Sequence, residues 1–124
     1  MLYAFWYTIS LIQKISFISI FALELFLYLF TALRNPGIYT RSVPTFNRGT
    51  IYCKKCLTNK EDNVYHCYDC GVCIKGHDHH CVWTGKCIGS NNYVPFIFFV
   101  ICTPVYFIVV FLITGSAISH HKLL

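Results

Sequence analysis

The stretch HCYDCGVCIKGHDHHCVWTGKC, residues 66–87, decides how this chain folds. It concentrates cysteine and histidine, which bind zinc in proteins, in a region with few large apolar side chains. Two Cys-x2-Cys units overlap within it, and a third, CKKC, begins at Cys53. This spacing lets two thiolates reach one tetrahedral ion at about 2.3 Å. Because so little apolar core is available, we expect metal binding to supply much of the folding free energy of this region.

The region holds more candidate ligands than the eight that two zinc ions need. The side chains of neighbouring residues diverge, so His66 and Cys67 are expected to bind different ions, and the two sites interleave along the chain. By the same reasoning His79 and His80 have different roles. The candidates are Cys53, Cys56, His66, Cys67, Cys70, Cys73, His77, His79, His80, Cys81 and Cys87.

Spacing alone does not show which cysteine stays free of metal. Cys81 is the best candidate for a nucleophile, because it follows Asp78 and His79, which can orient and supply a general base. A histidine beside a thiol lowers its pKa and makes it a better nucleophile. The alternative is that Cys81 is simply another zinc ligand.

The two ends of the chain have the composition of membrane segments. The 124 residues are 56% hydrophobic and 12% charged, whereas soluble domains carry about 25% charged residues. No charged residue occurs from Tyr93 to Ser119, which predicts a membrane-spanning helix with a kink at Pro104. Ile15 to Leu33 predicts a second span, an uncleaved anchor, with Glu24 facing a protein interior or water.

The basic residues give an orientation. Eight of the ten Lys and Arg residues lie between Arg34 and Lys86, so the positive-inside rule places this loop in the cytosol. In a reducing compartment clustered cysteines bind metal rather than form disulfides. We find no stripe of basic and aromatic residues that indicates a nucleic-acid partner, and no internal repeat longer than the Cys-x2-Cys unit.

The expected fold is that of a mainly α-helical membrane protein with two transmembrane helices. They flank a small cytosolic cysteine-rich domain of short β-hairpins and loops with two structural zinc sites. The expected order is an N-terminal transmembrane segment (1–33), a cytosolic linker (34–52), the zinc domain (53–92), a C-terminal transmembrane helix (93–119) and a tail (120–124).

The cysteine-rich stretch resembles the corresponding domain of the DHHC protein S-acyltransferases, or palmitoyltransferases. Asp78, His79, His80 and Cys81 match the tetrad that names the family, and the match runs from Cys53 to Phe96. The resemblance implies two structural Zn²⁺ ions and leaves Cys81 unligated. It assigns one zinc to Cys53, Cys56, His66 and Cys73, and the other to Cys67, Cys70, His80 and Cys87.

The resemblance also implies an activity. Cys81 would attack the thioester of an acyl-CoA, usually palmitoyl-CoA, with His79 as base polarised by Asp78, and would pass the acyl group to membrane-proximal cysteines of substrate proteins. Basic side chains near the site are candidates to pair with the CoA phosphates. His77 is interpreted as a surface residue. The candidate phosphate ligands are Lys75, Lys86 and Arg48.

The chain departs from the family pattern in several places. It offers two of the usual four transmembrane helices and ends before the Thr-Thr-x-Glu motif. Asn35 replaces the aspartate of an Asp-Pro-Gly motif, and Lys86 replaces the asparagine before the last zinc cysteine. The alternative function is therefore a non-catalytic membrane-anchored zinc scaffold, or a fragment of a larger DHHC protein that self-associates or joins partner subunits. The expected location is the endoplasmic reticulum, the Golgi, another endomembrane or the plasma membrane.

Overall fold

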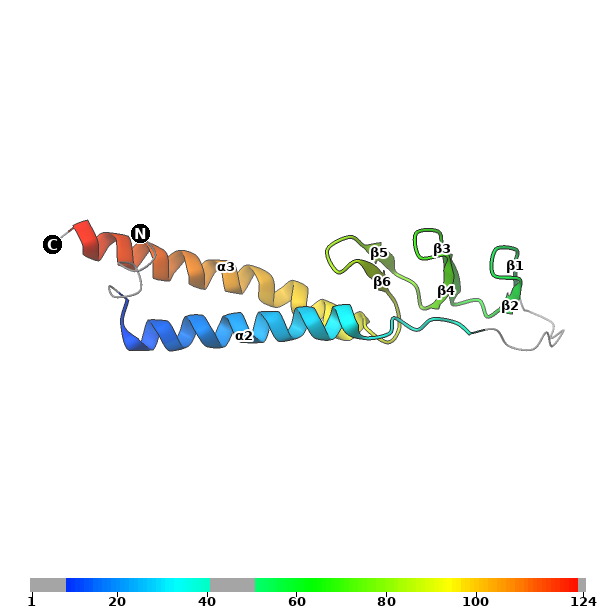
Figure 1. Ribbon diagram of the computed structural model, residues 1–124, viewed down its shortest axis with the longest axis horizontal. Helices are drawn as coiled ribbons and strands as arrows, with labels where there is room; N and C mark the ends of the chain where they lie inside the picture. Colours follow the sequence, from blue (N-terminus) through cyan, green and yellow to red (C-terminus); the bar gives the residue numbers. More distant parts are fainter. Residues whose placement is uncertain (1–8, 41–50, 123–124) are drawn as a thin grey trace. The chain divides into compact units, whose positions relative to one another are not determined.

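The protein was analysed as a computed structural model that describes residues 9–40 and 51–122 (Figure 1). The chain forms two units. The first contains the described residues up to Leu27 together with those from Phe98 onward, and the second runs from Tyr28 to Ile97. Helices α2 (Leu11–Leu33) and α3 (Tyr93–Lys122) each begin in one unit and end in the other.

Helix α2 begins four residues earlier than the apolar pattern predicts. Ser10 and Gln13 form a capping box: the Gln13 N–H donates to Ser10 Oγ at 3.3 Å, and the Ser10 N–H donates to Gln13 Oε1 at 2.8 Å. Two N–H groups at the helix start are thereby satisfied, which fixes the first turn at Leu11. The expected span therefore lengthens to Leu11–Leu33.

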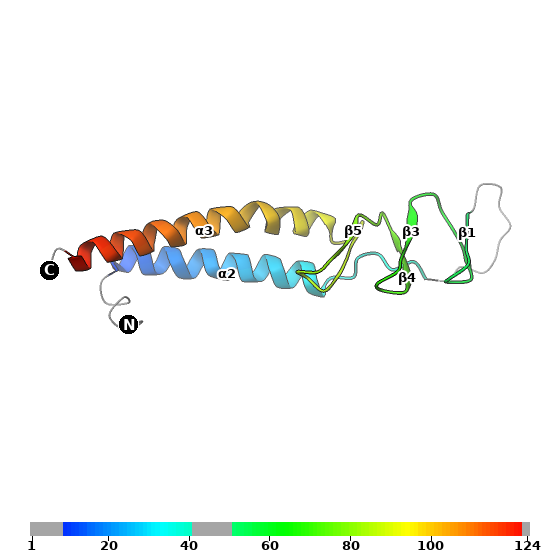
Figure 2. The ribbon, with the colours of Figure 1, turned by 90° about the horizontal axis from the view of Figure 1, so that it is seen from above.

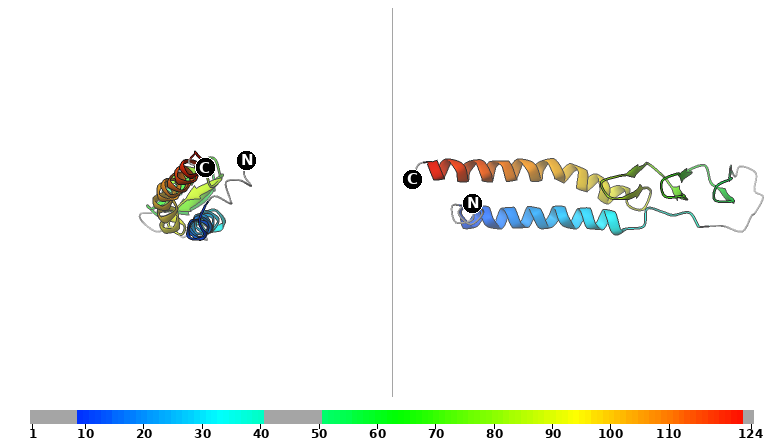
Figure 3. Two further views of the ribbon diagram at one scale, coloured as in Figure 1. Left: turned by 90° about the vertical axis from the view of Figure 1, so that its left-hand side faces the viewer. Right: turned by 45° about the horizontal axis from the view of Figure 1, so that its top comes forward.

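Helices α2 and α3 run antiparallel and side by side in the first unit (Figures 2 and 3). Ile9, Ile113 and Ala117 form its buried apolar cluster. Most other apolar side chains of the helices, such as Phe107 and Phe111, are exposed. Because both helices are long and apolar enough to cross a membrane, lipid rather than protein is the expected neighbour of these side chains.

Polar pairs also join the two helices within this unit. Gln13 Nε2 donates to Ser116 Oγ at 2.9 Å, and the Thr103 hydroxyl donates to Glu24 Oε1 at 2.6 Å. The half-buried Glu24 thus faces α3, as expected of an ionisable residue within a membrane span. Helix α3 continues through Pro104.

The second unit carries three antiparallel β-hairpins in chain order (Figure 1). This architecture confirms the expected fold class, with two apolar helices flanking a cysteine-rich region of short strands. The hairpins are β1 (Ile51–Cys53) with β2 (Thr58–Lys60), β3 (Val64–Cys67) with β4 (Val72–Lys75), and β5 (His79–Cys81) with β6 (Lys86–Ile88).

The hairpins share one register. In each, the last residue of the first strand is a cysteine that pairs with the first residue of the second strand. These cysteines, Cys53, Cys67 and Cys81, follow one another at a constant interval of 14 residues. The prediction that no repeat exceeds the Cys-x2-Cys unit is therefore wrong. The repeat is hidden because the residues within each turn differ.

The segment that follows α2 is attached to the second hairpin. The Tyr39 N–H donates to the Cys73 carbonyl at 2.8 Å, and the Lys75 N–H donates to the Gly37 carbonyl at 2.9 Å. Asn35 starts this segment by accepting the N–H groups of Gly37 and Ile38 on its Oδ1 atom. A side-chain oxygen is all this turn requires, so asparagine serves where the family has aspartate.

The hairpins have little apolar core of their own. Val64, Ile74 and Ile88 are the fully buried large apolar side chains of the described part of this unit. The buried clusters around Val64 and Ile74 are completed by cysteines. A core built largely from thiols supports the expectation that metal binding contributes to folding.

Candidate metal centres and active site

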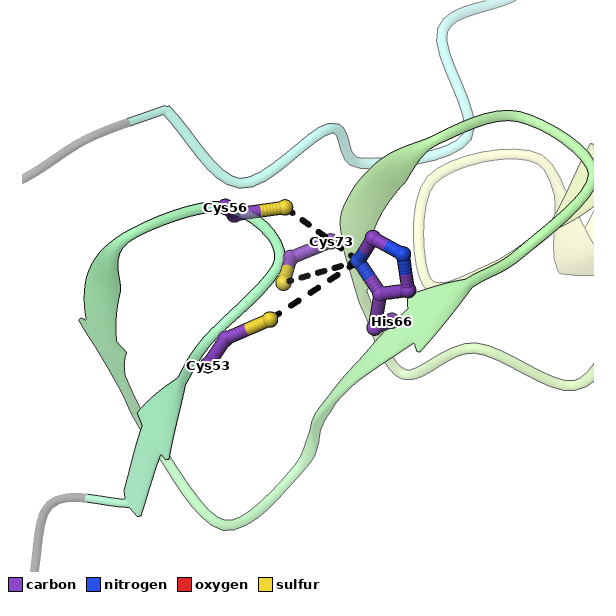
Figure 4. A group of neighbouring side chains, drawn as sticks. All are labelled: Cys53, Cys56, His66 and Cys73. Atoms are coloured by element: carbon purple, nitrogen blue, oxygen red, sulfur yellow. Dashed lines mark hydrogen bonds between the residues drawn. The ribbon is translucent and has the colours of Figure 1, made fainter.

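Four side chains from the first two hairpins converge on one point (Figure 4). His66 Nδ1 lies 3.7 Å from Cys53 Sγ, 3.2 Å from Cys56 Sγ and 3.9 Å from Cys73 Sγ. Cys53 ends β1 and Cys56 lies in the turn that follows it, whereas His66 and Cys73 are directly paired across β3 and β4. These are the four residues that the resemblance assigns to one zinc.

A second group of the same form lies between the second and third hairpins. His80 Nδ1 lies 3.7 Å from Cys67 Sγ, 3.3 Å from Cys70 Sγ and 3.7 Å from Cys87 Sγ. His80 and Cys87 are paired across β5 and β6. His66 and Cys67 thus belong to different groups, as the argument from neighbouring side chains predicts.

Both groups have the dimensions of a tetrahedral metal site. An ion with sulfur at about 2.3 Å and nitrogen at about 2.0–2.1 Å holds these ligands about 3.6 Å apart. The six sulfur–nitrogen distances lie between 3.2 and 3.9 Å. Three cysteines and one histidine form a common structural zinc set, so the residues fit the ion that the family implies.

The titration of the two groups is also consistent with a bound cation. Burial, followed by the neighbouring thiols of Cys53 and Cys56, raises the pKa of Cys73 to about 12. Burial and the thiols of Cys70 and Cys67 likewise raise the pKa of Cys87. Without a cation the thiols of each group resist ionising together. A bound dication removes that repulsion, because it binds the thiolate form.

Asp78, His79 and Cys81 lie at the β5–β6 hairpin and belong to neither metal group. His79 Nδ1 is 2.8 Å from Asp78 Oδ2, which leaves Nε2 as the ring nitrogen available to the Cys81 thiol. The His79 ring also meets the Phe96 ring edge-on, with 5.2 Å between centroids. His79 and His80 therefore have separate surroundings, as expected.

The surroundings of Cys81 favour its thiolate. Burial opposes ionisation, but hydrogen bonds from the Thr84 hydroxyl, the Thr84 and Trp83 N–H groups and His79 outweigh it, so the pKa of Cys81 is lowered. Burial also opposes protonation of His79, yet its hydrogen bonds to Asp78 and Cys81 and their charges raise its pKa. The pair is thus biased towards thiolate and imidazolium, which activates a cysteine nucleophile.

Asn92 fixes the third hairpin at the start of α3 and was not assigned a role from the sequence. Its side chain is fully buried. Oδ1 accepts the Gly89 N–H at 2.9 Å, while Nδ2 donates to the carbonyls of Cys87 at 3.0 Å and Thr31 at 3.4 Å. One side chain therefore ties a metal-group cysteine to the last turns of α2.

Further contacts place the same hairpin against the end of α2. Lys86 Nζ donates to the Arg34 carbonyl at 3.1 Å, and the Tyr28 hydroxyl lies 3.5 Å from the Trp83 carbonyl. A cation at a helix C-terminus is favourable. Lys86 therefore binds the end of α2 with one of its three N–H donors, and its role towards a CoA phosphate stays a prediction.

The remaining candidates have different outcomes. Lys75 is exposed and lies 3.5 Å from Glu61, and Arg48 lies outside the described residues. His77 is not a simple surface residue: its Nε2 atom is buried without a hydrogen-bond partner in the described part of the chain. Burial raises the pKa of the Cys67 thiol, but hydrogen bonds from the Cys70 N–H, Cys87, His77 and His80 outweigh it and lower the pKa to about 6.

The sequence matches the family model described as DHHC palmitoyltransferase over residues 47–123. Similar proteins include palmitoyltransferase akr1 of Schizosaccharomyces pombe, which is 36% identical over 68% of this chain and 16% of its own length. Palmitoyltransferase pfa3 of Aspergillus fumigatus is 38% identical over 63% of this chain and 14% of its own length. Probable protein S-acyltransferase 13 of Arabidopsis thaliana is 46% identical over 46% of this chain and 19% of its own length.

The chain spans less than a fifth of the length of each of these relatives. The matched segment nevertheless contains the three hairpins and α3. Both the coverage of the family model and the ligand geometry lead to one conclusion: this chain belongs to the DHHC palmitoyltransferase family.

Proposed function

We propose that this chain is a membrane-anchored protein S-acyltransferase that carries the acyl group on Cys81. The observation that supports this proposal most directly is the Asp78–His79–Cys81 arrangement outside both metal groups. If the hairpins served only to bind zinc, all seven of their cysteines would be expected to act as zinc ligands. A free thiol with a lowered pKa beside an oriented histidine is suited to attack on a thioester.

The proposed reaction has two transfers. The Cys81 thiolate attacks the carbonyl carbon of palmitoyl-CoA or a similar acyl-CoA, the bond from that carbon to the CoA sulfur breaks, and the acyl-enzyme thioester forms. His79 holds the proton taken from Cys81 and gives it to the departing CoA thiolate, while Asp78 fixes the imidazole orientation. A substrate cysteine then attacks the acyl-enzyme in the same way and restores the Cys81 thiol.

Two zinc ions would act structurally in this protein. We propose that Cys53, Cys56, His66 and Cys73 hold one, and that Cys67, Cys70, His80 and Cys87 hold the other. Each ion would cross-link two successive hairpins and so replace a hydrophobic core that these segments lack.

The proposed location is a membrane with the hairpins on its cytosolic side. The excess of Lys and Arg between Arg34 and Lys86 supports this orientation. Acyl-CoA has a lipid tail and a polar head, so a nucleophile at the membrane surface can reach its thioester. The expected acceptors are membrane-proximal cysteines of other proteins.

Labelled palmitoyl-CoA tests the proposal on purified chain in detergent. We expect a hydroxylamine-sensitive adduct in the wild type and in Cys102→Ser, because Cys102 lies within α3 and belongs to neither metal group. We expect none in Cys81→Ser, since a hydroxyl is a far poorer nucleophile than a thiolate. A protein that binds two zinc ions but forms no adduct would instead be the non-catalytic zinc scaffold.

A further inference from the structure

The metal groups follow the 14-residue repeat of the hairpins. In each group two cysteines come from the turn of one hairpin, and the histidine and third cysteine are a directly paired couple on the next hairpin. The couples are His66 with Cys73 and His80 with Cys87. Each ion would therefore join the turn of one hairpin to the strands of the following one.

The β5–β6 turn is the third of this series. Cys81 occupies the place that Cys53 and Cys67 occupy in the earlier turns, and Thr84 occupies the place of their second cysteine, three residues later. The backbone follows the same course, because the next residue has a positive φ in every turn. These residues are Leu57 (φ 52), Gly71 (φ 69) and Gly85 (φ 65).

In the described part of the chain, the third turn lacks the second cysteine of a Cys-x2-Cys pair, and no histidine and cysteine couple follows it on a further hairpin. Helix α3 begins at Tyr93, soon after β6 ends at Ile88, so no further hairpin offers a histidine and cysteine couple. Thr84 also supplies a neutral hydroxyl where the earlier turns supply a thiolate. It is buried, and its hydroxyl hydrogen is shared between the Cys81 thiol and the Cys81 carbonyl, whose oxygen lies 3.4 Å from Thr84 Oγ1, so both contacts stay within the turn.

We infer that the β5–β6 turn has the form of a metal-binding turn that holds no metal, and that Thr84 is the specificity-determining residue that keeps Cys81 a nucleophile instead of a ligand. The nucleophilic role of Cys81 rests on the proposed function. The metal-free state of the turn rests on the repeat alone. A threonine hydroxyl is absent from the usual zinc ligands, which are thiolate, imidazole and carboxylate.

This inference makes Thr84→Cys the decisive variant. It restores a Cys-x2-Cys pair on backbone that already has the required course. The first cysteine of that pair, Cys81, is hydrogen-bonded to His79, whose Nδ1 lies 2.8 Å from Asp78 Oδ2. Two thiolates and the free imidazole nitrogen then form a three-ligand site with an open position, which suffices to bind zinc. The bound ion would occupy both the nucleophile and its base.

The experiment counts zinc and records Co²⁺ spectra on the full chain in detergent under reducing conditions. We expect two equivalents in the wild type and in the matched control Thr84→Val, which keeps the shape of the side chain but cannot ligate. We expect three equivalents in Thr84→Cys, with added thiolate-to-Co²⁺ absorption. The double variant Thr84→Cys/Cys81→Ser should return to two, because Cys81 is one of the ligands.

Acyl-adduct formation is read on the same samples. Thr84→Cys should lose the adduct when the third ion is bound and regain it when a mild chelator removes that ion alone. Two equivalents in Thr84→Cys, or three in the wild type or in the double variant, would overturn the inference. The metal count does not depend on acyl transfer. If no variant forms an adduct, the proposed function fails while the assignment of the turn is still decided.

Discussion

Asn92 is the polar side chain whose removal should most disturb the second metal group. It is fully buried and makes its hydrogen bonds to three backbone groups, one of them the carbonyl of Cys87. Asn92→Ala deletes all of them without removing a metal ligand. The variant therefore separates the support of the metal group from metal binding itself.

The size of the effect follows from the groups left unpaired. Asn92→Ala leaves the Gly89 N–H and the Cys87 carbonyl buried without this partner, and each such group costs about 1–3 kcal/mol. The contact to the Thr31 carbonyl, at 3.4 Å, is long and adds little. We therefore expect a loss of at least about 2 kcal/mol, which corresponds to about a 30-fold change in an opening equilibrium.

Metal release to a colorimetric chelator measures this opening, because the ligands must separate before the ion leaves. We expect Asn92→Ala to release one of its two ions at least about 30-fold faster than the wild type. The neighbouring variant Asn91→Ala is the matched control, since the Asn91 side chain is exposed. A release rate for Asn92→Ala within about threefold of the wild type would refute the assigned role.

Three other outcomes are expected. Cys81→Ser should keep both zinc ions and lose the acyl adduct, whereas Cys87→Ser should lose one ion and unfold at lower temperature; zinc analysis and thermal melts distinguish them, and the reverse pattern would disprove the assignment. His79→Ala should shift the rise of acylation rate with pH to higher pH, because His79 helps to lower the pKa of Cys81, and an unshifted profile would contradict this role. In sealed microsomes, protease added outside should cut the segment that carries the hairpins, and its full protection would refute a cytosolic location.

The apolar helices and the interleaving of the metal groups were predictable from local chemistry, whereas the four ligands of each group came from the resemblance to the family. The uncharged stretch from Tyr93 to Ser119 is long and apolar enough to cross a membrane, which its composition alone indicates. Interleaving of the two metal groups followed from the divergence of His66 and Cys67. Both features need only neighbouring positions in the sequence, so they required no knowledge of how distant segments pack.

The supports of the third hairpin were not predictable in this way. The contacts of Asn92 with Thr31 and of Lys86 with Arg34 join residues that are far apart in the sequence. Nothing in the local pattern marks these polar side chains as buried or as helix-end ligands. The role proposed for Thr84 had a detectable signal, which is the constant spacing of Cys53, Cys67 and Cys81. A search for repeated residues misses this signal because the other residues of each turn differ.

The proposed metal ions and the contacts with α2 would hold different parts of the three hairpins. In the proposed assignment each ion would join a turn to the next hairpin, so the series of cross-links would end before the β5–β6 turn. That turn must stay metal-free if Cys81 is to react, yet a thiol must be held in place to meet a thioester. The contacts of Lys86 and Asn92 with the end of α2 supply the missing restraint. On the proposed function, Cys81 would thus stay both unligated and positioned, because the end of α2 takes the part that a third zinc would otherwise have.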